Sequence, residues 1–419
     1  MAAIQKAACE ACGRASTTRC AGCIEGLDHY GQPSPTYYCN KTCQKAHWTE
    51  HKADCKLANT RKVLYRGGEL LQKAFYTFRD VAFDLKITSV TKQGEALIVH
   101  DQCIDMSQGP LFRFPDRMVA DEVDKKSILT LNACNDAPAY LHELSKKVFQ
   151  GVSGQIQQIK EVRLLVDEKK CRSVKLYRNR KLDDSDYFHE VIKVALSDSA
   201  AYALDLAGAQ YGQLKSVIPF EDYARDYVTV VCSEFDHGWH ANDFRELLMG
   251  KHDLPAGYDV RIPLIAKEVT QALNYAVQDW EEENETVSHM LDQKQPVFAS
   301  KLDNFLGRLR DDIRAYVHHF ESNGSKFSIL SASDGDAGKP SYGDAIKTKE
   351  TAKRASPSLG SGTSSMQEEL RRARFFDPVT EPPKQLTEKE LRKNFAGAPK
   401  GVQEFVAKFA AGGGKVHQF

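Results

Sequence analysis

The stretch that decides the first part of the fold runs from residue 9 to residue 55 and reads CEACGRASTTRCAGCIEGLDHYGQPSPTYYCNKTCQKAHWTEHKADC. It holds seven of the 11 cysteines in the chain. Their spacing is Cys9-x2-Cys12-x7-Cys20-x2-Cys23-x15-Cys39-x3-Cys43-x7-His51-x3-Cys55, which makes four pairs of potential metal ligands. Zn²⁺ takes thiolate and imidazole ligands in sets of four, so these eight side chains predict two tetrahedral zinc sites.

The four pairs call for two kinds of local structure. A tight turn brings both sulfurs of a Cys-x2-Cys pair to one ion. The pairs with three intervening residues favour a helix, because residues four apart share a helical face, and residues 41–57 are expected to be helical. His47 has the same spacing as His51, but a finger with eight ligands needs no ninth. His29 is expected to be a solvated loop residue.

At these positions the sequence resembles the MYND zinc finger. The residues that carry the resemblance are the following: Tyr38-Cys39, Cys43-Gln44-Lys45, Trp48, His51-Lys52 and Cys55. The interval 24–38 is longer than usual in that family and is expected to form a loop. The resemblance implies two cross-braced sites, a pairing that spacing alone does not decide. One zinc ion takes Cys9, Cys12, Cys39 and Cys43, and the other takes Cys20, Cys23, His51 and Cys55.

Such a finger is expected to bind a partner rather than to catalyse a reaction. Four protein ligands leave no open position on either zinc ion, and the two structural ions supply the folding energy of a segment too small for a core of its own. The resemblance implies a protein partner with a proline-containing motif, with Gln44 and Trp48 in the binding groove, in a chain of eukaryotic type. Alternatively, Trp48 is a core residue of the small fold.

Composition excludes several other classes of protein. Lysine and arginine number 57, as do aspartate and glutamate, so the net charge of zero argues against direct nucleic-acid binding. No apolar run approaches the ~20 residues of a membrane span, and the N-terminus does not read as a secretory leader. We therefore expect an intracellular protein, in the nucleus or the cytoplasm. Walker A, GxGxxG, GxSxG and HExxH sequences are absent.

Beyond the finger, the pattern predicts an α+β fold with a mainly antiparallel sheet and flanking helices. Apolar residues at helical spacing mark helices at 70–85 and 137–148. Strand patterns occupy 95–100, 161–167, 173–177, 187–196 and 202–207, without repeating βαβ units. Residues from 221 onward turn helical, with long amphipathic helices at 265–280 and 298–320.

The composition further divides the chain. Residues 1–58 form the finger, 62–220 the α+β domain and 221–322 a helical region. Residues 323–365, rich in Ser, Gly, Lys and Thr, have the composition of a disordered linker. Residues 366–419 regain helical periodicity and are expected to form a helical tail.

One further constellation suggests chemistry. Cys134 precedes a predicted helix, His189 lies near the start of a strand and Asp205 lies on the next strand. A hairpin turning at residues 197–199 would bring His189 and Asp205 together, within a residue or two of register. The order Cys, helix, His and Asp over residues 127–212 is similar to the core of the transglutaminase-like and papain-like fold, although no diagnostic motif surrounds Cys134.

Two interpretations of these three residues stay open. In the functional one, Cys134 is the nucleophile, His189 the base and Asp205 the group that orients the imidazole for acyl transfer. In the structural one, which we favour, Cys134 is a small core residue and the other two are polar residues of a strand and a turn. Cys103, Cys171 and Cys232 are interpreted as structural. The leading hypothesis is a zinc-binding adaptor; the alternative is a cysteine hydrolase or acyltransferase recruited by its finger.

Overall fold

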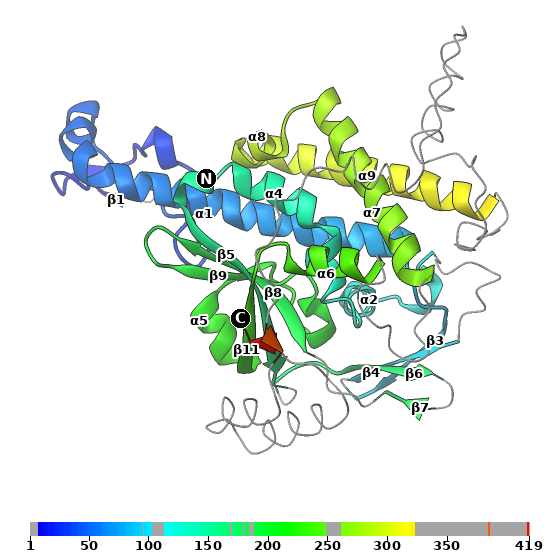
Figure 1. Ribbon diagram of the computed structural model, residues 1–419. Coiled ribbons are helices and arrows are strands. Elements are labelled where there is room, and N and C mark those ends of the chain that lie inside the picture. Colours follow the sequence, from blue (N-terminus) through cyan, green and yellow to red (C-terminus); the bar gives the residue numbers. More distant parts are fainter. Residues whose placement is uncertain are drawn as a thin grey trace, which may run out of the picture.

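The computed structural model describes residues 7–94, 96–102, 113–167, 170–178, 181–183, 188–248 and 261–322, with two short strands at 384–385 and 417–418. It is an α+β structure with the finger at one end of a long helix (Figure 1). None of the helices in this part of the chain combines the length and the apolar character needed to cross a bilayer.

Helix α1 (Lys41–Val81) connects the finger to the rest of the molecule. It begins after Asn40, whose side-chain oxygen accepts a hydrogen bond from the backbone N–H of Cys43, a typical N-cap. Its first turns carry finger residues, and its second half is buried between helices and sheet. The helical segments predicted at 41–57 and 70–85 are thus one continuous helix, and the expected boundary at residue 58 lies inside it.

The larger sheet has five antiparallel strands in the order β10-β9-β8-β5-β11. The smaller sheet has the order β3-β4-β6-β7, and in it β4 and β6 run parallel. The strands are β3 (Ile87–Gln93), β4 (Ala96–Asp101), β5 (Ile156–Val166), β6 (Val174–Arg178), β7 (Lys181–Leu182), β8 (His189–Leu196), β9 (Ala201–Leu204), β10 (Val217–Pro219) and β11 (Val228–Asp236). Most strand pairs are antiparallel, as the sequence pattern predicted.

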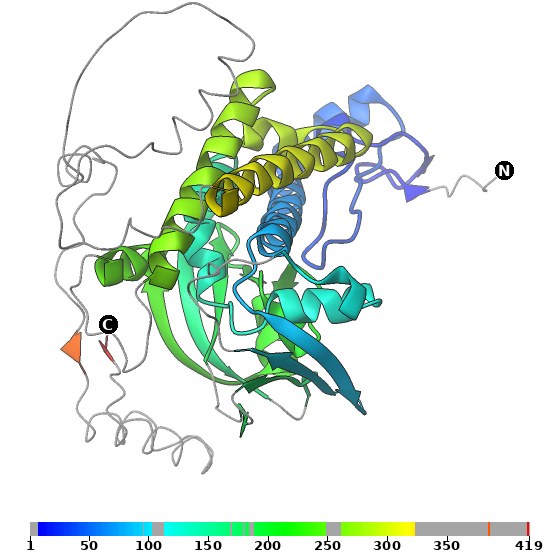
Figure 2. The same cartoon turned by 90° about the vertical axis from the view of Figure 1, so that its right-hand side faces the viewer.

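Helices cover both faces of the larger sheet. The main core lies between α1, the helices around it and the face of β8 that carries Ile192, Val194 and Leu196. A smaller core on the opposite face packs Val191 against Tyr223 of α5. Helices α7, α8 and α9 lie on the side of α1 away from the sheets (Figures 1 and 2). The remaining helices are α2 (Glu122–Leu129), α3 (Asp136–Tyr140), α4 (His142–Gln150), α5 (Phe220–Tyr227), α6 (Trp239–Leu248), α7 (Arg261–Glu283), α8 (Val287–Asp292) and α9 (Gln295–Ser322).

The structure differs from the sequence prediction in several places, and α2, β7 and β10 were not predicted at all. β11 is an edge strand inside the region expected to be helical, because its backbone pairs with β5. β3 was missed, since most of its residues are exposed and show little apolar alternation. The helix predicted at 137–148 is divided at Leu141 into α3 and α4. The linker at 323–365 lies outside the described residues, as does most of the expected helical tail, where β12 (Lys384–Gln385) pairs with β13 (His417–Gln418).

Candidate functional site

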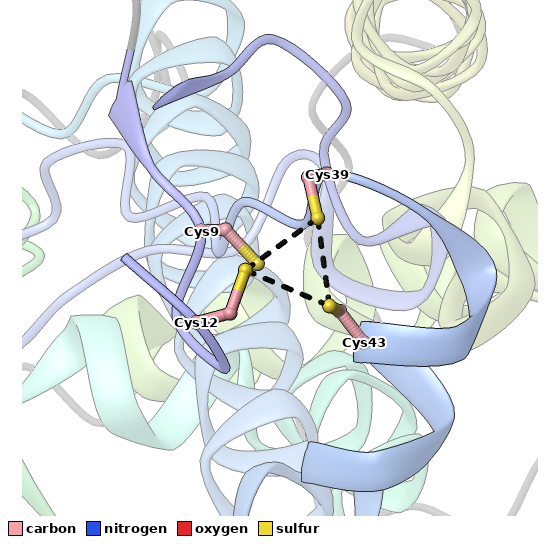
Figure 3. A group of neighbouring side chains, drawn as sticks. All are labelled: Cys9, Cys12, Cys39 and Cys43. Carbon is pink, nitrogen blue, oxygen red and sulfur yellow. Dashed lines mark hydrogen bonds between the residues drawn. The ribbon is translucent and has the colours of Figure 1, made fainter. Parts of the chain in front are cut away.

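The first metal cluster joins a hairpin to the start of α1. Strands β1 (Ala7–Ala8) and β2 (Ala15–Ser16) pair, and the turn between them presents Cys9 and Cys12. Cys39 precedes the N-cap of α1 and Cys43 lies in its first turn, so this pair is not presented from one helical face as expected. Figure 3 shows the four sulfur atoms converging on one point.

The sulfur distances of this cluster fit a zinc ion. The sulfurs of Cys12, Cys39 and Cys43 lie 3.4, 3.6 and 3.7 Å from one another. A tetrahedral site with Zn–S bonds of about 2.3 Å has sulfurs about 3.8 Å apart. Arg14 donates to the Cys12 sulfur over 3.4 Å, and this hydrogen bond lowers the pKa of Cys12 to about 6. The cluster therefore has the sulfur spacing of a zinc site, and Arg14 favours the thiolate form of Cys12, whereas hydrogen bonding to Cys39 and burial raise the pKa of Cys43 to about 12.

The second cluster lies deeper. Cys20 is the N-cap of the 3-10 helix η1 (Ala21–Cys23) and Cys23 is its last residue. His51 and Cys55 lie one turn apart on α1, as their spacing predicts. The Cys23 sulfur is 3.5 Å from His51 Nε2, close to the ~3.6 Å edge of a tetrahedral Zn–S/N site. Burial and the neighbouring sulfurs raise the pKa of Cys55 to about 12. A divalent cation offsets that cost, because it attracts thiolates into a buried site.

Two histidines near the clusters are not ligands. His47 Nδ1 lies 3.0 Å from the Tyr38 hydroxyl and belongs to neither ligand set. His29 was expected to be solvated, but its Nδ1 lies 2.9 Å from the hydroxyl of Tyr202 on β9. The loop from 24 to 38 thus rests on the body, where the Tyr65 hydroxyl also donates to the backbone carbonyl of His29.

The two residues predicted to bind a partner differ in their surroundings. Gln44 donates from Nε2 to the Cys20 sulfur over 3.4 Å and so supports the second metal cluster. Trp48, one turn later on α1, is 42% exposed and meets the His51 ring edge-on. The buried aromatic residue of the finger is Tyr38, at 1% exposed. Trp48 therefore lies at the surface and Tyr38 fills the small core.

The structure also places Cys134, His189 and Asp205 together. His189 Nε2 lies 3.0 Å from Asp205 Oδ1, and the hydroxyl of Tyr223 donates to Asp205 Oδ2 over 2.8 Å. Ile192 pairs with Leu204, so Asp205 comes opposite Val191, two residues from His189. Asp205 is thus diagonal to His189, within the predicted tolerance of register.

The electrostatics of this group are those of an ion pair. Burial alone lowers the pKa of His189, but Asp205 and the nearby Cys134 thiol outweigh it and raise that pKa to about 10. The other ring nitrogen, Nδ1, is buried and makes no hydrogen bond. The Cys134 sulfur instead donates to the Phe188 carbonyl over 3.3 Å. All three residues are buried, with Cys134 at 7% exposed.

A comparison with protein-family models identifies the N-terminal segment. The MYND finger model matches residues 9–55, which contain both metal clusters. No curated protein and no solved structure matches this chain. The similarity of residues 127–212 to the transglutaminase-like and papain-like core therefore stays a prediction. Because each cluster offers four ligands with zinc spacing, residues 9–55 are a MYND finger, a protein-interaction module with two structural zinc sites.

Proposed function

We propose that this protein is an adaptor whose finger captures a proline-containing segment of a partner protein on the surface around Trp48. The observation that carries this proposal is the exposure of Trp48. Both metal clusters are closed by four protein ligands, so the zinc ions have no position left for a substrate. The function of the finger then rests on its surface.

The physical basis is the stacking of proline on an exposed aromatic ring. A proline-rich segment is already extended in polyproline II form, so binding costs it little conformational entropy. Trp48 offers a rigid apolar face, and Gln44 lies one turn before it on the same side of α1. Because Gln44 donates a hydrogen bond to the Cys20 sulfur, its substitution is expected to weaken the second metal cluster as well as the proposed peptide-binding surface.

The test is binding of a proline-containing peptide library to the full chain, read by affinity and by zinc content. Trp48→Ala should abolish binding and keep all bound zinc. Tyr30→Ala, which removes an aromatic residue of the finger loop that is 62% exposed, is the matched control and should bind normally. Equal binding by the Trp48→Ala variant, or by peptides with every proline replaced by alanine, would refute the proposal.

As a second function, we propose cysteine-dependent acyl transfer at Cys134. The observation that favours it is the His189–Asp205 pair at 3.0 Å beside a thiol. A protonated imidazole held by a carboxylate stabilises a neighbouring thiolate, which is the nucleophilic form of cysteine. The Cys134 sulfur is almost fully buried, so this chemistry requires an opening that admits the substrate.

The second function is tested by the alkylation rate of each cysteine in zinc-loaded protein from about pH 5 to pH 9. Fast reaction of Cys134 below about pH 7, lost in His189→Ala, would support an activated thiolate. Cys232, a partly buried cysteine whose pKa burial raises to about 12, is the internal control for an unactivated thiol. An inert Cys134 would contradict the acyl-transfer proposal and leave the adaptor proposal untouched.

A further inference from the structure

A third group of metal-binding side chains lies in the body, far along the chain from the finger. It consists of His142, Glu161 and His237, each with a ligand atom within 4.8 Å of the others. His142 is the first residue of α4, Glu161 lies in the middle of β5, and His237 follows the end of β11. The two imidazole rings are in contact, with centroids 4.7 Å apart.

We propose that His142, Glu161 and His237 form a third divalent metal site, which takes Zn²⁺ or a similar transition-metal ion. Two imidazoles and one carboxylate are a ligand set that zinc accepts. Ligands in a tetrahedral site lie about 3.4 Å apart, so ion binding requires these three ligand atoms, which lie within 4.8 Å of one another, to move closer together. Three protein ligands leave a coordination position for water or another small ligand, unlike the closed clusters of the finger.

Hydrogen bonds around His237 fix the tautomer of its imidazole ring. The Ser145 hydroxyl donates its one hydrogen to the His142 carbonyl over 2.7 Å, so it accepts at His237 Nε2, 2.9 Å away. Nε2 therefore carries the ring proton and Nδ1 carries the lone pair. This is the arrangement that supporting residues impose on metal-binding histidines.

Glu161 is likewise held by its neighbours as an anion. Its Oε2 accepts from the backbone and ring N–H groups of His240, over 2.9 and 2.6 Å. Its Oε1 accepts from the backbone N–H of Gly238 over 2.6 Å and keeps one lone pair for a metal. Three hydrogen bonds from N–H groups thus favour the carboxylate form of Glu161.

The turn that follows β11 places His237 next to His142 and Glu161. Gly238 has φ of 96°, which favours glycine. A Cβ atom at Gly238 would also come within 2.6 Å of the His142 ring. A larger residue at position 238 would therefore collide with the His142 ring.

The test measures metal content of the full chain after saturation with Zn²⁺ and removal of excess ion. Wild-type protein should hold one more ion per chain than His237→Gln or Glu161→Gln. His289→Gln, which alters a histidine whose side chain is 65% exposed and lies outside the cluster, should match wild type. Equal metal content in wild type and both cluster variants would overturn the proposal.

A second measurement tests the proposal even if the ligand variants fail to fold. With Co²⁺ in place of zinc, the finger gives thiolate charge-transfer absorption, whereas a site of nitrogen and oxygen ligands adds only weaker ligand-field bands. Ser145→Ala keeps all three ligands and loses the orienting hydroxyl, so it should bind Co²⁺ at the third site ~10- to 100-fold more weakly. Unchanged Co²⁺ affinity in a folded Ser145→Ala, or no ligand-field band in wild type, would also refute the site.

Discussion

The finger and the body share helix α1, but different interactions stabilise each of them. In the first turns of α1 the buried residues that pack are His51 and Cys55, both metal ligands. In the second half they are apolar residues such as Leu70 and Phe75, packed between the sheet and the C-terminal helices. The small core of the finger consists of metal-binding cysteines together with Tyr38 and Ala58, so metal bonds supply most of its stability. Helix α1 therefore connects a module that is folded by metal ions to a domain that is folded by the burial of apolar side chains.

Removal of a ligand from the second metal cluster should cause the largest loss of stability. This loss should be confined to the finger and leave the body folded. In Cys55→Ala we expect the loss of one zinc ion, and with it on the order of 10 kcal/mol of metal-binding free energy. Hydrogen exchange should then accelerate over residues 9–40, while 63–81 stay protected. Cys232→Ala, outside the finger, is the control. A Cys55→Ala protein with wild-type zinc content would show that this ligand assignment is wrong.

Overpacking the second half of α1 should produce a smaller loss, confined to the body. A Cβ atom at Gly68 would overlap the Cγ2 atom of Val217 on β10, and both are buried. Gly68→Ala should cost about 1–3 kcal/mol, measured by denaturant unfolding, with zinc content unchanged. Gly307→Ala in α9, where a Cβ meets open space, should instead add about 0.5–1 kcal/mol. A stabilised Gly68→Ala would mean that this contact is loosely packed.

The buried ion pair of the body should appear as a pH dependence that the finger does not share. The pKa of His189 is about 10 in the fold, above its ordinary value of 6.5. Its contribution to stability is therefore fully present below pH 6.5 and is lost as the pH rises toward 10. The melting temperature should fall over this window in wild type and fall less in His189→Gln. His289→Gln is the control, and equal slopes in all three proteins would contradict the ion pair.

Loss of a contact between the finger and the body should have the smallest effect on stability. His29→Ala removes the hydrogen bond to Tyr202 and should cost about 1 kcal/mol or less. Its expected signature is local: faster hydrogen exchange in the 24–38 loop with the melting temperature little changed. Tyr30→Ala, at the exposed tip of the same loop, should leave exchange at wild-type rates. A loop as protected in His29→Ala as in wild type would show that other contacts hold it.

Much of the finger was predictable, because residue type and spacing identify its metal ligands. The helical pair His51 and Cys55 follows from a separation of four residues. The start of α1 at Lys41 was predicted, but the expectation that Cys39 and Cys43 share a helical face was wrong, because Cys39 lies before the N-cap Asn40. The sequence of residues 24–38 also did not indicate that this loop contacts the body, where His29 forms a hydrogen bond with the distant Tyr202.

In the body, alternation within a strand was readable but pairing between distant strands was not. The face of β8 that carries Ile192, Val194 and Leu196 follows from its period of two, and so does the opposite position of His189. β11 was missed although it begins with the strand-favouring residues Val228-Thr229-Val230-Val231, because the whole region from residue 221 was interpreted as helical. His142, Glu161 and His237 carry no motif, because they come from three elements that only the fold brings together.

The sequence by itself determined that this chain carries a zinc finger, since eight ligands at fixed spacing have few other uses in a segment too small to bury a core. It also determined the α+β class, through periodicities of 3.6 and 2. Only the tertiary structure decided that Trp48 is exposed, that the finger continues into the body through α1, and which distant polar groups meet. Those outcomes depend on contacts between residues far apart in the chain, and local pattern carries no information about such contacts.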